Sequence, residues 1–150
     1  MTDDHRGSDL WEEGRPLRIL LADDHEIVRQ HVRAILEEAG FEVAGETSDG
    51  RQAVRLARRL RPDLVILDVS MPRLNGFRAA EEILGHAPQT RVILLTVHAE
   101  RGYVRRAIQL GICGYVVKTQ MPDDLVAAIQ EVARGRTYQS HILSETAVPV

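Results

Sequence analysis

The sequence contains almost no lysine. It has 19 Lys and Arg residues together, and Lys118 is the one lysine among them. Arginine is a planar fork, whereas lysine is a compact point charge on a flexible stem. Lys118 directly follows the apolar run Tyr115-Val116-Val117. A lone ammonium at that place favours a narrow anionic pocket that excludes arginine, although a surface lysine left by a biased composition gives the same pattern.

Other absences limit the class of protein. Cys113 is the one cysteine, so no disulfide can form within the chain, which favours a reducing compartment. No apolar run approaches the roughly 20 residues that span a bilayer, and the acidic N-terminus is unlike a signal peptide. We therefore expect a cytoplasmic protein with no membrane partner. The formal net charge of -3 argues against a domain that binds nucleic acid by itself.

The apolar pattern predicts one α/β domain. Five short apolar runs alternate with five amphipathic segments that are typical of helices. The runs cover residues 19–22, 41–45, 64–67, 92–95 and 115–117. This repeat predicts a doubly wound, five-stranded parallel sheet with helices on both faces, and the alternation in 41–45 is typical of an edge strand. We expect a flexible tail over 1–16, the domain over 17–135 and a linker-like segment over 136–150.

Polar residues follow four of the five apolar runs. Asp23 and Asp24 follow the first run, Asp68 the third, Thr96 the fourth and Lys118 the fifth. Taken singly, the aspartates suit helix caps and turns, and the threonine suits a strand. The carboxyl ends of parallel strands share one edge of the sheet, which is where such folds bind ligands. We therefore expect these side chains to lie together at that edge.

Their chemistry predicts a site for a cation and a phosphoryl group. Three carboxylates in one crevice repel one another, and Lys118 compensates only part of their charge. Oxygen ligands select Mg²⁺, Mn²⁺ or Ca²⁺, and Mg²⁺ typically takes one or two carboxylates with waters and a phosphate. A carboxylate can attack phosphorus to form an aspartyl phosphate, and cations and hydrogen-bond donors stabilise the developing charge.

These motifs together resemble the receiver domain of two-component response regulators, the CheY-like family. The similarity runs from about residue 17 to residue 135. The resemblance implies a flavodoxin-like sheet with the strand order 2-1-3-4-5. It is carried by Leu21-Ala22-Asp23-Asp24-His25, by Leu67-Asp68-Val69-Ser70-Met71-Pro72 with Asn75-Gly76, by Leu95-Thr96 and by Gly114-Tyr115-Val116-Val117-Lys118.

The resemblance implies a phosphoacceptor and a metal site. Asp68 would accept a phosphoryl group from a sensor histidine kinase. Asp23, Asp24 and Asp68 would hold Mg²⁺ with the backbone carbonyl of Ser70, and one of the first two could bind it through a water molecule. The domain would promote its own phosphorylation and dephosphorylation, but it would turn over no separate metabolite.

The resemblance also implies a switch. Thr96 and Lys118 would bind the phosphoryl oxygens, and Tyr115 would turn inward as Thr96 moves toward the phosphate. In the simpler interpretation, Tyr115 is an edge-strand aromatic residue that packs on the fourth helix. The two interpretations are compatible, because such a switch is an aromatic residue with two rotamers.

The subgroup resembles the NarL/FixJ regulators. Residues 22–25, the turn at 111–115 and the pattern Gly135…Tyr138…Ser140 suit that group. Its members carry a C-terminal helix-turn-helix domain, so we expect an output in transcription, DNA contacted through that absent domain, and a homodimer on phosphorylation. The chain is either a receiver-only piece or a stand-alone receiver, and the linker-like end favours the piece.

Two positions bear on how this receiver differs from others. Many receivers have proline after the lysine, in a cis peptide, whereas this chain has Thr119. A cis Lys118–Thr119 bond would cost ~3 kcal/mol or more, so we expect either a trans bond or a strained site. Ser70 and His98 flank the phosphate position; neither is an obvious acid for positioning water, although the His98 ring is one candidate for it. We therefore predict a moderate to slow loss of the phosphoryl group.

Two other functions share parts of the pattern. A haloacid-dehalogenase-like phosphatase would carry its nucleophile in an Asp-x-Asp motif after the first strand, whereas the candidate Asp68 follows the third and position 70 is Ser. A flavodoxin-like flavin carrier would need a Ser/Thr/Gly loop where Asp23 and Asp24 lie. Both alternatives fit the residues less well than a receiver domain does.

Overall fold

The computed structural model describes residues 15–98 and 100–140. Most of the expected tail, residues 1–14, and most of the expected linker, residues 141–150, lie outside the described residues. The strands are β1 (Arg18–Ala22), β2 (Glu42–Thr47), β3 (Leu64–Asp68), β4 (Arg91–Thr96), β5 (Gly114–Val117) and β6 (Tyr138–Gln139). The helices are α1 (Glu26–Glu38), α2 (Gly50–Leu60), α3 (Gly76–His86), α4 (Arg101–Gln109) and α5 (Asp123–Ala133), with a short 3-10 turn over Lys118–Gln120.

The strands form one parallel sheet in the order β2-β1-β3-β4-β5-β6. The expected α/β class and the order of the first five strands are confirmed, and β2 lies at an edge as expected. The prediction of five strands is wrong, because β6 pairs with β5. Its two residues do not belong to an apolar run, so the hydrophobic pattern does not predict a strand there. They become a strand through backbone bonds: Tyr138 N–H donates to Cys113 O at 2.9 Å, and Ser140 N–H donates to Tyr115 O at 3.0 Å.

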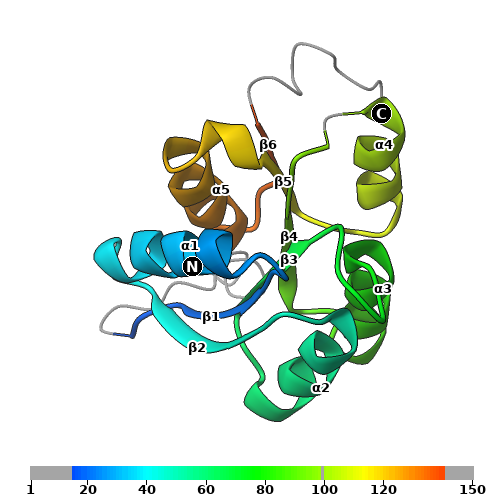
Figure 1. Cartoon of the computed structure of the whole chain (residues 1–150), viewed down its shortest axis with the longest axis horizontal. Helices are drawn as coiled ribbons and strands as arrows, with labels where there is room; N and C mark the ends of the chain where they lie inside the picture. Colours follow the sequence, from blue (N-terminus) through cyan, green and yellow to red (C-terminus); the bar gives the residue numbers. More distant parts are fainter. Residues whose placement is uncertain (1–14, 99, 141–150) are drawn as a thin grey trace, which may run out of the picture.

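Helices cover both faces of the sheet (Figure 1). Helices α1 and α5 pack on one face, over residues such as Leu21, Ile66 and Leu95, which are fully buried. Helices α2, α3 and α4 pack on the other face, over residues such as Leu67 and Leu94. Strands buried on both faces explain why the central apolar runs are uninterrupted. In the part of the chain that the structure describes, no helix is long and apolar enough to cross a membrane.

Side-chain caps fix where two of the helices begin. The carboxylate of Asp49 accepts a bond from Gln52 N at 2.9 Å at the start of α2, and the side chain of Asn75 accepts one from Arg78 N at 3.0 Å at the start of α3. Both are ordinary N-caps. Because the strands are parallel, their carboxyl ends and the starts of the helices that follow them lie along one edge of the sheet. That edge carries the candidate site.

Candidate functional site

Two carboxylates and the lone lysine meet at the carboxyl edge of the sheet. Asp23 follows β1, Asp68 ends β3, and Lys118 follows β5. The Lys118 Nζ atom lies 2.9 Å from Asp23 Oδ2 and 3.4 Å from Asp68 Oδ2. All three side chains are at most 10% exposed. The ammonium therefore bridges two buried carboxylates that follow or end different strands. The one lysine of the sequence thus lies in a confined anionic pocket, rather than on the open surface.

Asp24 and His25 complete an acidic cluster around this pocket. One ligand atom each from Asp23, Asp24, His25 and Asp68 lies within 4.8 Å of the others. Asp24 is the most open of the carboxylates, with a side chain 35% exposed, and its Oδ1 lies 3.3 Å from His25 Nδ1. Buried and exposed carboxylate oxygens side by side suit a hard divalent cation that keeps part of its water shell, as Mg²⁺ does. The donor set of the described residues thus fits the expected metal.

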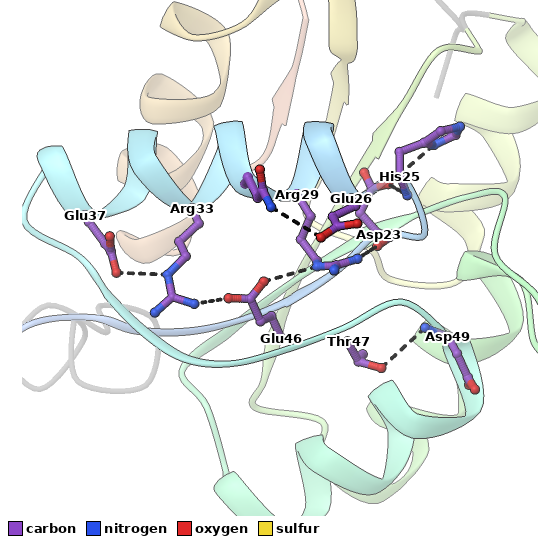
Figure 2. Close-up of polar contacts among 10 residues, drawn as sticks. Asp23, His25, Glu26, Arg29, Arg33, Glu37, Glu46, Thr47 and Asp49 are labelled. Atoms are coloured by element: carbon purple, nitrogen blue, oxygen red, sulfur yellow. Dashed lines mark hydrogen bonds and ion pairs between the residues drawn. The ribbon is translucent and has the colours of Figure 1, made fainter.

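A network on α1 fixes the loop that carries Asp23. Arg29 Nη1 donates to the Asp23 backbone carbonyl at 2.7 Å, while its Nε donates to Glu46 of β2 at 3.1 Å. Arg33 also contacts Glu46, and Figure 2 shows how these side chains link α1 to β2. The Asp23 carboxylate in turn accepts a bond from His25 N at 2.9 Å. One oxygen of Asp23 is therefore tied to its own loop, and the other faces the lysine.

Close packing of backbone fixes the loop after Asp68. A Cβ atom at Gly76 would lie 2.3 Å from the Asp68 carbonyl oxygen, so only glycine fits there. Gly76 N–H also donates to Val69 O at 2.8 Å. The start of α3 therefore rests directly on the segment that follows the candidate phosphoacceptor. Ser70 N–H points back to Asp68 Oδ1 at 3.4 Å.

The surroundings of Asp68 disfavour its charged form relative to a carboxylate in water. Burial, and then the neighbouring Asp23 carboxylate, raise the pKa of Asp68 to about 6. The Lys118 ammonium and the Ser70 N–H oppose this effect. Without a further cation the pocket holds more negative charge than its one lysine balances. A divalent cation at the acidic cluster would relieve the same repulsion.

Thr96 is the last residue of β4, and Tyr115 lies in β5, the strand that Lys118 follows. Thr96 is fully buried, and its Oγ1 accepts a bond from His98 N at 3.1 Å, which leaves the hydroxyl proton for another acceptor. Tyr115 is 2% exposed, and among the described residues its hydroxyl has no hydrogen-bond partner. Burial, followed by Glu100 and Tyr103, raises the pKa of Tyr115 above its usual value. The ring of Tyr115 is therefore buried in this structure, and its hydroxyl makes no hydrogen bond within the described residues.

The bond after the lysine is trans. Among the described residues the cis peptide bond lies at Met121–Pro122, and Lys118–Thr119 is not cis. Of the two expectations for Thr119, the trans bond is the one that is confirmed. A trans bond is the cheaper form for a residue other than proline. Sequence reasoning gave no role to His25 or Arg29, although His25 directly follows the Asp23-Asp24 pair and could have been suspected on that ground.

Comparison with known proteins gives the family. The sequence matches the response regulator receiver domain over residues 19–130. It is 35% identical to the uncharacterized transcriptional regulatory protein YxjL of Bacillus subtilis, over 87% of this chain and 62% of that protein. It is 39% identical to the response regulator UvrY of Escherichia coli, over 81% of this chain and 56% of that protein. The chain thus spans a little over half the length of these relatives.

A solved structure agrees in fold. A two-component response regulator of the LuxR family from Aurantimonas superposes with a TM-score of 0.82 at 33% identity, over 87% of this chain and 94% of that one. The chain therefore belongs to the response regulator receiver domain family, a family of signalling domains in two-component systems. The phosphatase and the flavin carrier do not fit this match.

Proposed function

We propose that Asp68 is the phosphoacceptor of this receiver domain. The observation that supports this most strongly is the position of its carboxylate. Asp68 is 3% exposed at the carboxyl end of β3, and its Oδ2 lies 3.4 Å from the only lysine of the chain. Because the pKa of Asp68 is about 6, most of the carboxylate is ionised at neutral pH and can act as a nucleophile.

The proposed reaction transfers a phosphoryl group from a phosphohistidine of a sensor kinase. An oxygen of Asp68 forms the new bond to phosphorus, and the bond between phosphorus and the histidine nitrogen breaks. The leaving nitrogen keeps the electron pair and takes up a proton. Lys118 Nζ, now 2.9 Å from Asp23, lies close enough to contact an oxygen of the arriving group. The Thr96 hydroxyl proton supplies a second donor to that group.

The proposed metal is Mg²⁺. Asp23, Asp24 and Asp68 would hold it, with the backbone carbonyl of Ser70 as a further ligand. When bound, it would neutralise charge on the carboxylates and on the phosphoryl oxygens. The acidic cluster and the raised pKa of Asp68 support this assignment, because both indicate negative charge in excess of what Lys118 balances.

The proposed switch couples Thr96 to Tyr115. When Thr96 turns toward the phosphoryl group, space opens beneath α4, and the inward position of Tyr115 is stabilised. The buried hydroxyl of Tyr115, which has no hydrogen-bond partner in the described part of the chain, supports this, because such a group gains from any new partner. We propose that the changed α4–β5 surface alters partner affinity, including the formation of a homodimer.

The proposed output is transcription. One of the relatives, YxjL, is named a transcriptional regulatory protein, and this chain covers 62% of it. The sensor kinase, the DNA contact through a further domain and a cytoplasmic location are part of the same proposal. The domain would act as a switch that promotes its own phosphorylation, rather than as an enzyme with a separate substrate.

Intact mass after incubation with Mg²⁺ and phosphoramidate tests the assignment. Wild type should gain one phosphoryl adduct, and Asp68→Asn should gain none. Asp63→Asn is a matched control, because Asp63 lies next to β3 at the opposite end of the strand and bonds to Arg15 and Arg18 instead. It should be phosphorylated like wild type. An adduct that persists in Asp68→Asn would contradict the assignment.

A further inference from the structure

Ser140 is a buried polar residue that the proposed mechanism does not use. It is fully buried and follows β6, outside the residues 19–130 that match the receiver family. Its Oγ accepts a hydrogen bond from Val117 N–H at 2.9 Å. Its own N–H donates to Tyr115 O at 3.0 Å. One residue far along the chain therefore holds the backbone of β5 at two points, one on each side of Val116.

Both points adjoin functional residues. Val117 directly precedes Lys118, and in the sheet it pairs with Thr96 of β4. The carbonyl that receives the Ser140 N–H belongs to Tyr115 itself. The two hydrogen bonds of Ser140, one through its backbone N–H and one through its hydroxyl, thus hold the last residues of β5. Lys118, whose ammonium contacts Asp23 and Asp68, comes directly after these residues.

The Ser140 hydroxyl supplies a hydrogen-bond acceptor that the backbone of β6 does not. Strand β6 ends at Gln139, so its backbone ladder stops before it reaches Val117. The Val117 N–H lies on the outer side of β5, away from β4, in a buried environment. A buried N–H without an acceptor is costly, and the Ser140 hydroxyl oxygen supplies that acceptor. The serine side chain thereby extends the ladder by one bond, to the residue before the lysine.

We propose that Ser140 is a positioning residue for phosphorylation, acting through Lys118. By fixing the Val117 N–H, its hydroxyl holds the end of β5 so that the Lys118 ammonium stays aimed at the acidic pocket. This inference rests on the proposed role of Asp68 and Lys118. It assigns a role in the receiver's chemistry to the segment that follows α5.

The test compares rates of phosphorylation by phosphoramidate in the presence of Mg²⁺. Ser140→Ala should lower the rate constant about tenfold, equivalent to about 1.4 kcal/mol in the barrier. Ser140→Cys keeps the size of the side chain but offers a weak acceptor, so it should be slowed as well. A rate like that of wild type in Ser140→Cys would show that the hydroxyl only fills space and would overturn the proposal.

Tyr138→Phe is the matched control for docking of β6. Its hydroxyl donates to Asp124 Oδ1 at 2.8 Å, so this variant loosens β6 without touching Val117. It should be phosphorylated at nearly the wild-type rate, and the Val117 amide should exchange its hydrogen faster in Ser140→Ala than in Tyr138→Phe. Equal slowing of phosphorylation in the two variants would mean that Ser140 acts through general stability, and it would overturn the proposal.

A double-mutant cycle with Lys118→Ala separates this inference from the proposed function. If Ser140 acts through the lysine, Ser140→Ala should have little further effect once Lys118 is replaced. The same tenfold loss in both backgrounds would contradict action through Lys118. If wild type and Tyr138→Phe are phosphorylated but Ser140→Ala is not slowed, the Ser140 role alone fails. If no variant, wild type included, gains a phosphoryl group on Asp68, the proposed function itself fails.

Discussion

Replacing Asp68 with asparagine should stabilise the metal-free protein at neutral pH. The carboxylate is 3% exposed and lies beside Asp23, which is fully buried. These surroundings raise the pKa of Asp68 from 3.8 to about 6, a difference of about two. Because one pKa unit corresponds to about 1.4 kcal/mol, the charged form of Asp68 is disfavoured by about 3 kcal/mol in the folded state. Asparagine keeps the shape and removes the charge, and Lys118 keeps its shorter contact with Asp23.

The sign of the pH dependence follows from the same difference. The folded state binds the Asp68 proton more tightly than the unfolded state does, so this group favours folding most strongly at low pH. That contribution is lost as the pH rises from about 4 to about 6. The advantage of Asp68→Asn over wild type should therefore be largest above pH 6 and should shrink as the pH falls toward about 4.

Urea unfolding in EDTA measures the effect. At neutral pH the midpoint of Asp68→Asn should lie about 1–2 M above that of wild type. Asp24→Asn is the control, because its side chain is 35% exposed and solvent already screens its charge, so its midpoint should move much less. The reasoning is refuted if Asp68→Asn is no more stable than wild type at neutral pH, or if its advantage does not shrink in acid. Added Mg²⁺ should stabilise wild type more than Asp68→Asn.

Three further predictions concern the same site. Lys118→Arg keeps the charge, but a planar guanidinium does not fit between two carboxylates where the lysine side chain is only 10% exposed. Phosphorylation should therefore slow at least tenfold. An unchanged rate would show that the pocket does not exclude arginine. His98 follows Thr96 by two residues, and its backbone N–H donates to the Thr96 hydroxyl. If its ring positions the attacking water, His98→Ala should lengthen the lifetime of the phosphoryl group a few-fold; an unchanged lifetime by intact mass would show that His98 has no such role. Arg29→Gln breaks the charged bond to the Asp23 carbonyl and should cost about 1–2 kcal/mol of unfolding free energy in urea; a loss no larger than for Arg55→Gln, whose side chain contacts Gln52 on the surface, would contradict that role.

The sheet could be predicted where the chain itself carries the signal. The apolar runs at β1, β3 and β4 are buried on both faces, so hydrophobicity alone marks them. Strand β6 could not be found in this way. Tyr138 and Gln139 are half-buried, and they form a strand only because Cys113 and Tyr115 offer backbone partners from another part of the chain. Such pairing depends on tertiary structure, and no local pattern encodes it.

The candidate site shows the same division. Asp23, Asp68 and Lys118 could be placed together because each follows a parallel strand, and the structure brings all three within contact distance. The position of Arg29 depends on its bonds to the Asp23 carbonyl and to Glu46 of β2, and the proposed role of Ser140 depends on the bond that its hydroxyl accepts from the Val117 N–H. Sequence spacing carries no information about these bonds, because they depend on side-chain rotamers and on the position of β6.

Chemical mapping of the phosphoryl group tests the central claim most directly. The protein is phosphorylated with phosphoramidate and Mg²⁺ and then reduced with borohydride, which converts an aspartyl phosphate into homoserine. Mass spectrometry of the peptides then locates the homoserine. The account predicts conversion at Asp68, with Asp23 and Asp24 unchanged. Conversion at Asp23 or Asp24, or a phosphoryl adduct that yields no homoserine at Asp68, would contradict it.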